Sequence, residues 1–171
     1  SSSSAASDVY KRQIYNIPGR TGREISIPVI RRLAELPNIV AVKEAGGSVD
    51  RVSDIIASCD IAVLSGDDSL TLPMMVLGAK GVISVTANLI PEDVKAMVDA
   101  ALAGRFHDAC ALHFKMLPFV RECFREGNPA GIKTAMKLAG LINGELRLPL
   151  VPCLPENEAK MRKVLLDYGI L

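Results

Sequence analysis

The stretch that decides the fold is residues 38–47, NIVAVKEAGG, where a lysine and a glutamate follow a short apolar run and precede two glycines. The run is short and rich in β-branched residues, which predicts a strand over 39–43. Side chains alternate along a strand, so Lys43 and the two valines face opposite sides. If the valines pack against helices, Lys43 points to the other side of the sheet.

Three further short apolar runs resemble this one: IYNI at 14–17, IAVLS at 61–65 and GVISV at 81–85. The four runs begin roughly 20–25 residues apart, which is the spacing of successive strand-plus-helix units. They are apolar on both faces, so they suit a parallel sheet covered by helices better than a half-exposed antiparallel sheet.

Amphipathic segments with helix signals follow the strand candidates. The first has Ser26 as a possible N-cap, Pro28 in its first turn and a stop before Pro37. After Gly104 the strand candidates cease and a Pro-rich stretch separates further helical segments. We expect helices over 26–36, 48–59, 68–78, 90–104, 105–124, 129–141 and 156–169.

Four β/α units followed by helices predict the second half of a (β/α)8 TIM barrel with a helical C-terminal domain. An open four-stranded α/β sheet is the structural alternative. We expect a half-barrel over 14–104 and a helical domain over 105–171. Residues 1–13, SSSSAASDVYKRQ, lack the apolar stretch of a signal peptide. We interpret them as a disordered tail or a non-native leader, such as a translated adaptor joined to a truncated gene.

Composition excludes several classes of protein. The 171 residues carry 20 Lys and Arg against 19 Asp and Glu and no Trp, which argues against a nucleic-acid partner. No apolar run approaches the roughly 20 residues that span a bilayer. The four cysteines are widely spaced and form no C-x-x-C pair, as expected of reduced thiols. We therefore expect a soluble cytoplasmic protein without a nucleic-acid or membrane partner.

In such folds the chemistry gathers where strands end. A lysine pointing into a barrel is partly desolvated, and its neutral amine can attack a ketone to form a Schiff base. Tyr15 could transfer protons near the same rim, and Arg20 could bind a carboxylate. The alternatives are that Lys43 reaches water or pairs with Glu44, that Tyr15 is structural and that Arg20 is a solvated loop residue.

Two other groups of residues are weaker candidates. His107, Cys110 and His113 lie within two helical turns, but the rotation of about 600° between the outer pair keeps them off a common face of the helix, so we expect no metal site there. Asp67 and Asp68 resemble an acidic metal pair, but a helix N-cap explains them as well.

Four segments resemble the dihydrodipicolinate synthase family: YNIPGRTG (15–22), VKEAGG (42–47), LSGDDSLTLPMMVLGAKGVISVTAN (64–88) and NPAGIKTAMKLAGL (128–141). The similarity runs from about Ile14 to the C-terminus. It implies a homotetramer that condenses pyruvate with L-aspartate 4-semialdehyde in lysine and diaminopimelate biosynthesis, without a metal or organic cofactor.

Residue roles are also implied by the resemblance alone. Lys43 would form the Schiff base with pyruvate, Tyr15 would relay protons and Arg20 would bind the carboxylate of the semialdehyde. The backbone of Gly66 and Ile83 would line the pyruvate pocket, with Asp67 beside them.

The family's first four β/α units have no counterpart in this sequence. They include the loop with the relay threonine and the tyrosine that a partner subunit supplies. We therefore expect the chain alone to be inactive. The rival functions are a related pyruvate-dependent lyase or aldolase, such as N-acetylneuraminate lyase or a 2-keto-3-deoxy sugar acid aldolase, and a non-catalytic half-barrel that assembles with a partner.

Overall fold

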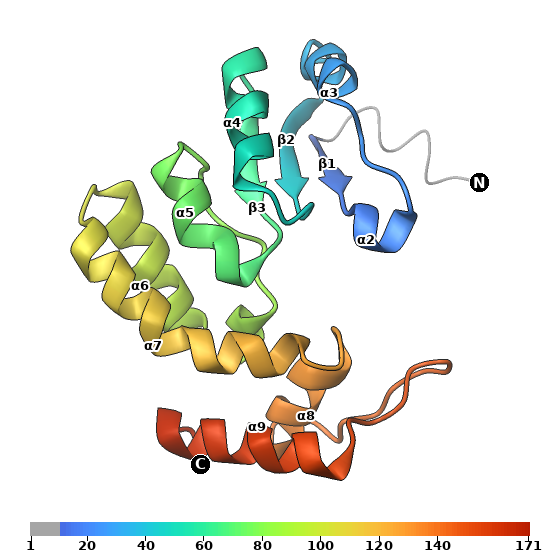
Figure 1. Ribbon diagram of the computed structural model, residues 1–171, viewed down its shortest axis with the longest axis vertical. Helices are drawn as coiled ribbons and strands as arrows, with labels where there is room; N and C mark the ends of the chain where they lie inside the picture. Colours follow the sequence, from blue (N-terminus) through green and yellow to red (C-terminus); the bar gives the residue numbers. More distant parts are fainter. Residues whose placement is uncertain (1–10) are drawn as a thin grey trace. The chain divides into compact units, whose positions relative to one another are not determined.

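The computed structural model describes residues 11–171 (Figure 1). The chain divides into two compact units, one ending at Ile83 and one running from Ser84 to Leu171. The division falls before the boundary expected at residue 104, because the helix that follows Ile90 packs along the next helix of the second unit.

The first unit contains a parallel sheet in the order β1-β2-β3, as the apolar runs predict. Its strands are β1 (Arg12–Asn16), β2 (Ile39–Glu44) and β3 (Ala62–Ser65). β1 begins at Arg12, so it includes the last two residues that we assigned to the leader. Residues 1–10 of that leader lie outside the described residues.

The prediction of a fourth strand over 81–85 is wrong, since the described residues form regular strands only at β1, β2 and β3. The segment forms an isolated parallel bridge between Val82 and Ser65. Ser65 donates its N–H to the carbonyl of Gly81 at 2.8 Å and accepts from the N–H of Ile83 at 2.9 Å. The N–H of Lys80 also donates to the Val63 carbonyl at 2.8 Å, so the chain runs beside β3 just before the bridge. The pairing stops after the bridge because the chain enters a 3-10 turn at Thr86.

Helices cover one side of this sheet (Figure 1). They are α3 (Ile27–Ala34), α4 (Val49–Ser58) and α5 (Thr71–Val76), with the 3-10 turn η1 (Asp68–Leu70) before α5. Ser26 occupies the N-cap position of α3 without a side-chain hydrogen bond, whereas Ser48 caps α4 by accepting from the Arg51 N–H at 3.2 Å. The core between sheet and helices is apolar and contains Ile30, Val42, Val52, Ile55 and Val63.

One helix of this unit has no counterpart in the sequence-based expectation. α2 (Pro18–Thr21) is a single turn directly after β1 (Figure 1). It ends at Gly22, whose φ of 68° lies in the left-handed region that glycine adopts without strain. Four residues are too few to show an amphipathic period, so the sequence indicates only a loop.

The second unit is helical. It consists of the 3-10 turn η2 (Thr86–Asn88) and the helices α6 (Pro91–Leu102), α7 (Phe106–Phe124), α8 (Ala130–Leu138) and α9 (Pro155–Tyr168). All four helices fall within the segments expected from the sequence or one residue beyond them. Their buried side chains include Met97, Met116, Phe119 and Leu165. Within residues 11–171, no helix is both long and apolar enough to cross a membrane.

Candidate functional site

Lys43 and Tyr15 are direct neighbours at the carboxyl end of the sheet. They are register partners in the parallel pair of β2 and β1. The Lys43 Nζ lies 4.0 Å from the centroid of the Tyr15 ring, a cation–π distance. Tyr15 is 45% exposed and Lys43 is half-buried, so both remain within reach of a small molecule. The structure thus brings together the two residues for which we predicted catalytic roles.

Two alternatives for these residues are wrong. Lys43 does not pair with Glu44, because the Glu44 side chain is fully buried and forms its ion pair with Arg51 at 3.0 Å. Tyr15 is not packed beneath a loop, since nearly half of it is exposed. Of the two valines expected to pack on helices, Val42 is fully buried but Val40 is 38% exposed.

Gly66 is packed against the lysine. A Cβ atom at this position would lie 3.0 Å from Lys43 Cε and 2.7 Å from the Cβ of Ala45. Real Cβ atoms do not approach other atoms so closely, so any larger residue would displace the lysine side chain or the backbone beside it. The sequence-based expectation concerned the backbone of Gly66. The structure adds that its missing side chain leaves room for Lys43.

Asp67 links the loop after β3 to the loop after β2. Its Oδ2 accepts a hydrogen bond from the N–H of Gly47 at 3.1 Å. Burial raises the pKa of this carboxyl, and the nearby carboxylates of Glu44 and Asp68 raise it further, whereas the Gly47 N–H and Lys43 lower it. Asp67 stands at the N-cap position of η1 but makes no side-chain capping bond there, so the capping explanation does not hold for its side chain.

Ile83 and Arg20 lie in segments next to the strand ends. The N–H of Ile83 donates to the carbonyl of Ser65, and the Ile83 side chain is 40% exposed. Arg20 lies in the last turn of α2 and is exposed. α2 directly follows β1, so Arg20 is carried at the end of the strand that holds Tyr15 (Figure 1). Its binding role stays a prediction.

A buried polar cluster beneath these residues was missed by sequence reasoning. Glu44 accepts from the Asn16 side chain at 2.8 Å and from Arg51 Nε at 3.0 Å. All three side chains are buried. The sequence does contain a signal for this cluster. Asn16 directly follows Tyr15 and Glu44 directly follows Lys43, so both polar residues stand on the strand face that is otherwise apolar.

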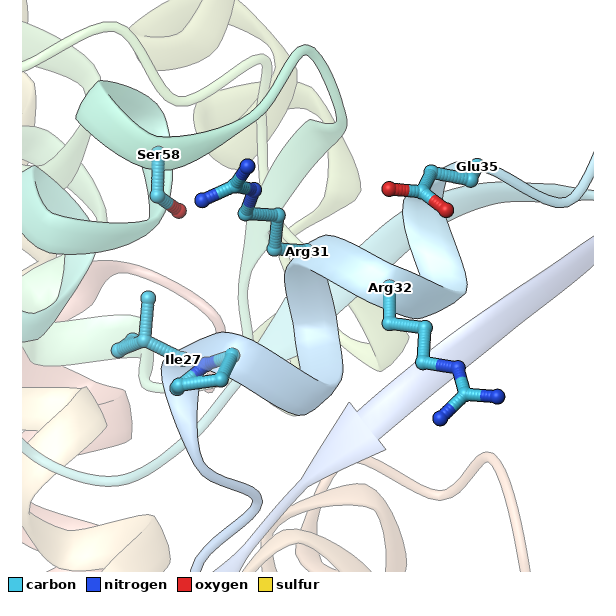
Figure 2. A pocket seen from close by; sticks show the side chains of 6 residues that line it. Ile27, Arg31, Arg32, Glu35 and Ser58 are labelled. Atoms are coloured by element: carbon cyan, nitrogen blue, oxygen red, sulfur yellow. The ribbon is translucent and has the colours of Figure 1, made fainter.

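A separate hollow of about 450 Å³ lies on α3 and the end of α4 (Figure 2). Arg31 points toward Ser58, whereas Arg32 points away from it. The two guanidinium groups therefore do not converge on one anion. The hollow is formed by helices rather than by the strand ends, so it is separate from the site around Lys43.

The histidines of α7 do not form a metal site with their neighbours. His107 and Cys110 are exposed, and burial lowers the pKa of His113. Over residues 11–171, no group of three or more His, Cys, Asp or Glu side chains is placed to hold an ion.

The fold and the site define a class of protein: part of an α/β barrel with a lysine and a tyrosine in contact at its strand ends. The profile of the dihydrodipicolinate synthetase family matches residues 5–167. The chain belongs to this family.

Relatives and solved structures agree with this assignment. The chain is 50% identical over 160 residues to the 4-hydroxy-tetrahydrodipicolinate synthase of Syntrophotalea carbinolica, covering 92% of the chain and 55% of the relative. It is 52% identical over 155 residues to that of Methanothrix thermoacetophila, covering 89% and 52%. The crystal structure of dihydrodipicolinate synthase from Aquifex aeolicus superimposes with a TM-score of 0.92 at 48% identity, covering 94% of this chain and 56% of that one.

The similarity extends to a lysine-bound dihydrodipicolinate synthase from Cyanidioschyzon merolae, with a TM-score of 0.93 at 34% identity, covering 98% of this chain and 58% of that one. The chain thus spans about half the length of the curated relatives that it matches. The fold is that of part of a TIM barrel followed by helices.

Proposed function

We propose that the complete gene product condenses pyruvate with L-aspartate 4-semialdehyde to give 4-hydroxy-tetrahydrodipicolinate, in lysine and diaminopimelate biosynthesis. The observation that supports this most strongly is the contact between the Lys43 amine and the Tyr15 ring, 4.0 Å apart at the strand ends. Family membership and the names of the relatives at about half identity support the same reaction.

Lys43 begins the reaction. Its neutral amine attacks the ketone carbon of pyruvate, and loss of water from the carbinolamine gives a protonated imine. The imine withdraws electrons from the adjacent methyl group, which loses a proton and becomes an enamine. The enamine carbon then attacks the aldehyde carbon of the semialdehyde, forming the new carbon–carbon bond. The amine derived from the semialdehyde then attacks the imine carbon. A ring forms, the bond from that carbon to the Lys43 nitrogen breaks, and Lys43 is released as a free amine.

Tyr15 and Arg20 assist the two substrates in different ways. Tyr15 lies against the amine and carries a phenol, which can move the protons that carbinolamine formation and breakdown require. Arg20 presents a guanidinium group, whose paired N–H donors match the carboxylate of the semialdehyde. Both residues lie on β1 or directly after it, so the position of this strand controls both functions.

The pyruvate pocket is assigned to Gly66, Asp67 and Ile83. The close packing of Gly66 on the Lys43 side chain, next to the carbon that carries the amine, supports this assignment. Ile83 is tied by its N–H to Ser65, one residue before Gly66. Asp67 follows Gly66 and accepts a hydrogen bond from the Gly47 N–H, which joins the loop after β3 to the loop after β2. The proposed chemistry needs no metal or organic cofactor, because the imine itself withdraws the electrons.

The complete protein is further proposed to act in the cytoplasm as a homotetramer, as the family resemblance implies. The 171-residue chain alone is expected to be inactive. Among the described residues β1 pairs with β2 alone, so an edge of the sheet is open where a barrel would close.

The test is an assay of the complete gene product against two substrate sets. Condensation of pyruvate with the semialdehyde, without cleavage of sialic acid or 2-keto-3-deoxy sugar acids, is the expected result. Cleavage of either sugar acid without condensation would replace the proposal by the related lyase or aldolase function. The purified 171-residue chain is assayed in parallel, and condensation by it would contradict the expected inactivity.

A further inference from the structure

Glu44 is a buried carboxylate that the proposed chemistry does not use. Its side chain is fully buried, directly after Lys43 in β2. Its Oε1 accepts from Asn16 Nδ2 and from the Gly46 N–H, each at 2.8 Å, and its Oε2 accepts from Arg51 Nε at 3.0 Å. Burying a charged group is unfavourable unless it is paired and hydrogen-bonded, and here these partners provide both.

The bond between Glu44 and Asn16 joins the ends of two strands. The two residues are register partners, and so are their neighbours Lys43 and Tyr15. Because side chains alternate, one pair is bonded on the helix-covered side while the other pair is stacked on the opposite side. A shift of one strand end relative to the other would therefore alter the contact between the lysine and the tyrosine.

Arg51 extends the cluster to the loop that follows α2. Its Nη1 lies 2.8 Å from Glu24 Oε1, and its Nη2 donates to the carbonyl of Ile25. The N–H of Ile25 donates to Asn16 Oδ1 at 3.0 Å, so both backbone groups of Ile25 are held. α2 is one turn long and buries no residue, so its own packing does little to hold it in place. The contacts of Arg51 and Asn16 with the loop after α2 therefore restrain the helix that carries Arg20.

We propose that Glu44 and Arg51 are positioning residues for the reaction at Lys43. Glu44 holds the strand end of Lys43 in register with that of Tyr15. Arg51 connects the same strand end to the loop that places Arg20 for the second substrate. The inference rests on the proposed function, because it assigns the two residues to the imine step and to the binding of the semialdehyde.

Two substitutions separate these roles. Glu44→Gln keeps the size of the side chain and an acceptor for Asn16, but it removes the charge and turns an amide donor toward Arg51. We expect it to slow imine formation with pyruvate about 10–100-fold, since small displacements of reacting groups have effects of this size. Arg51→Lys keeps a cation beside Glu44 but loses the fork that reaches the loop. We expect about a tenfold higher KM for the semialdehyde, with imine formation within about threefold of the unchanged protein.

The measurements are made on the complete gene product, at a temperature where circular dichroism shows each variant to be folded. Borohydride quenching at successive times gives the rate of imine formation, and steady-state assays give the KM of the semialdehyde. The matched control is Glu122→Gln, which removes the ion pair with Arg125 in the helical unit. This control should leave both parameters unchanged.

A merely structural role predicts lower thermal stability, with the imine rate per folded molecule and the KM of the semialdehyde unchanged. That result for both variants would overturn the inference while leaving the proposed function intact. If Glu44→Gln does not fold, Arg51→Lys alone decides. A higher KM for the semialdehyde with a nearly unchanged imine rate supports the inference, and an unchanged KM overturns it. Absence of imine formation in the unchanged protein would overturn the proposed function, and this inference with it.

Discussion

Single atoms decide how Lys43 is presented at the strand ends. The apolar strand brings the lysine to the sheet edge, but Gly66 and Tyr15 determine where its side chain lies. The absent Cβ of Gly66 leaves room for the aliphatic stem, and the Tyr15 ring faces the amine. Asp67 is half-buried near the same amine and carries a raised pKa. The site therefore combines close packing with charges that are only partly screened by water.

Gly66→Ala tests the close packing. The added Cβ would lie 2.7 Å from that of Ala45 and 3.0 Å from Lys43 Cε, so the lysine or the backbone must move. We expect the free energy of unfolding to fall by about 1–3 kcal/mol, as for other overpacked sites. Imine formation with pyruvate should slow about 10–100-fold. Gly19→Ala is the control, because nothing lies within 4 Å of a Cβ built there. An unchanged imine rate in Gly66→Ala would contradict the packing argument.

Asp67→Asn tests the raised pKa. A carboxyl whose pKa is higher in the folded than in the unfolded protein contributes stability below its unfolded value of 3.8, and this contribution is lost as the pH rises through the raised value. At neutral pH the substitution should therefore raise the free energy of unfolding slightly, by about 0.5 kcal/mol or less, because water screens a half-exposed site. The difference should vanish in acid. Urea unfolding across pH measures it, and a less stable variant at neutral pH would show that the Gly47 hydrogen bond requires the charge.

Among the secondary-structure elements, α9 is fixed by a polar cluster within the helical unit. Tyr168 near its end donates to Asp93 of α6, and Lys115 of α7 donates to the same carboxylate at 2.7 Å. Burial works against the charged form of Asp93, but the hydrogen bonds from Lys115 and Tyr168 outweigh it and lower its pKa. Burial and the Asp93 carboxylate raise the pKa of Tyr168, so its hydroxyl remains a donor. One carboxylate thus joins three helices.

Tyr168→Phe tests this cluster, because it removes the hydroxyl and keeps the ring near Phe119. We expect the free energy of unfolding to fall by about 1.5–2 kcal/mol, the lower part of the range for a hydrogen bond to a charged group. A lowered carboxyl pKa contributes stability above the unfolded value of 3.8, and this is lost as the pH falls through the folded value. The effect of the substitution should thus shrink in acid. The control is Lys95→Met, which breaks an exposed ion pair with Asp99 and should change stability by less than about 0.5 kcal/mol. An equal loss in both variants would contradict the role of the cluster.

At the scale of the whole molecule, the sequence predicts the regular elements better than the contacts between them. The runs at 39–43 and 61–65 show a strand pattern, and the structure confirms both strands within one residue. The segment over 81–85 shows the same pattern, but it forms a single bridge to β3 before the chain enters the 3-10 turn at Thr86, and no local pattern reveals how early the pairing stops.

The same limit applies to the site. The proximity of Lys43 and Tyr15 could be predicted, because both stand at the carboxyl ends of strand candidates and such ends meet at one edge of a parallel sheet. The burial of Glu44 could not, since a glutamate beside a lysine also fits an exposed ion pair. Its partner Arg51 belongs to a helix that only the folded chain brings near.

The central claim is that Lys43 forms an imine with pyruvate, and borohydride trapping tests it most directly. The complete gene product is incubated with pyruvate, reduced, digested and analysed by mass spectrometry, with Lys43→Arg and Lys95→Ala as paired variants. We predict a reduced pyruvate adduct on the peptide that contains Lys43, its loss in Lys43→Arg and its retention in Lys95→Ala. A folded protein without adduct, or with the adduct on another lysine, would contradict the account.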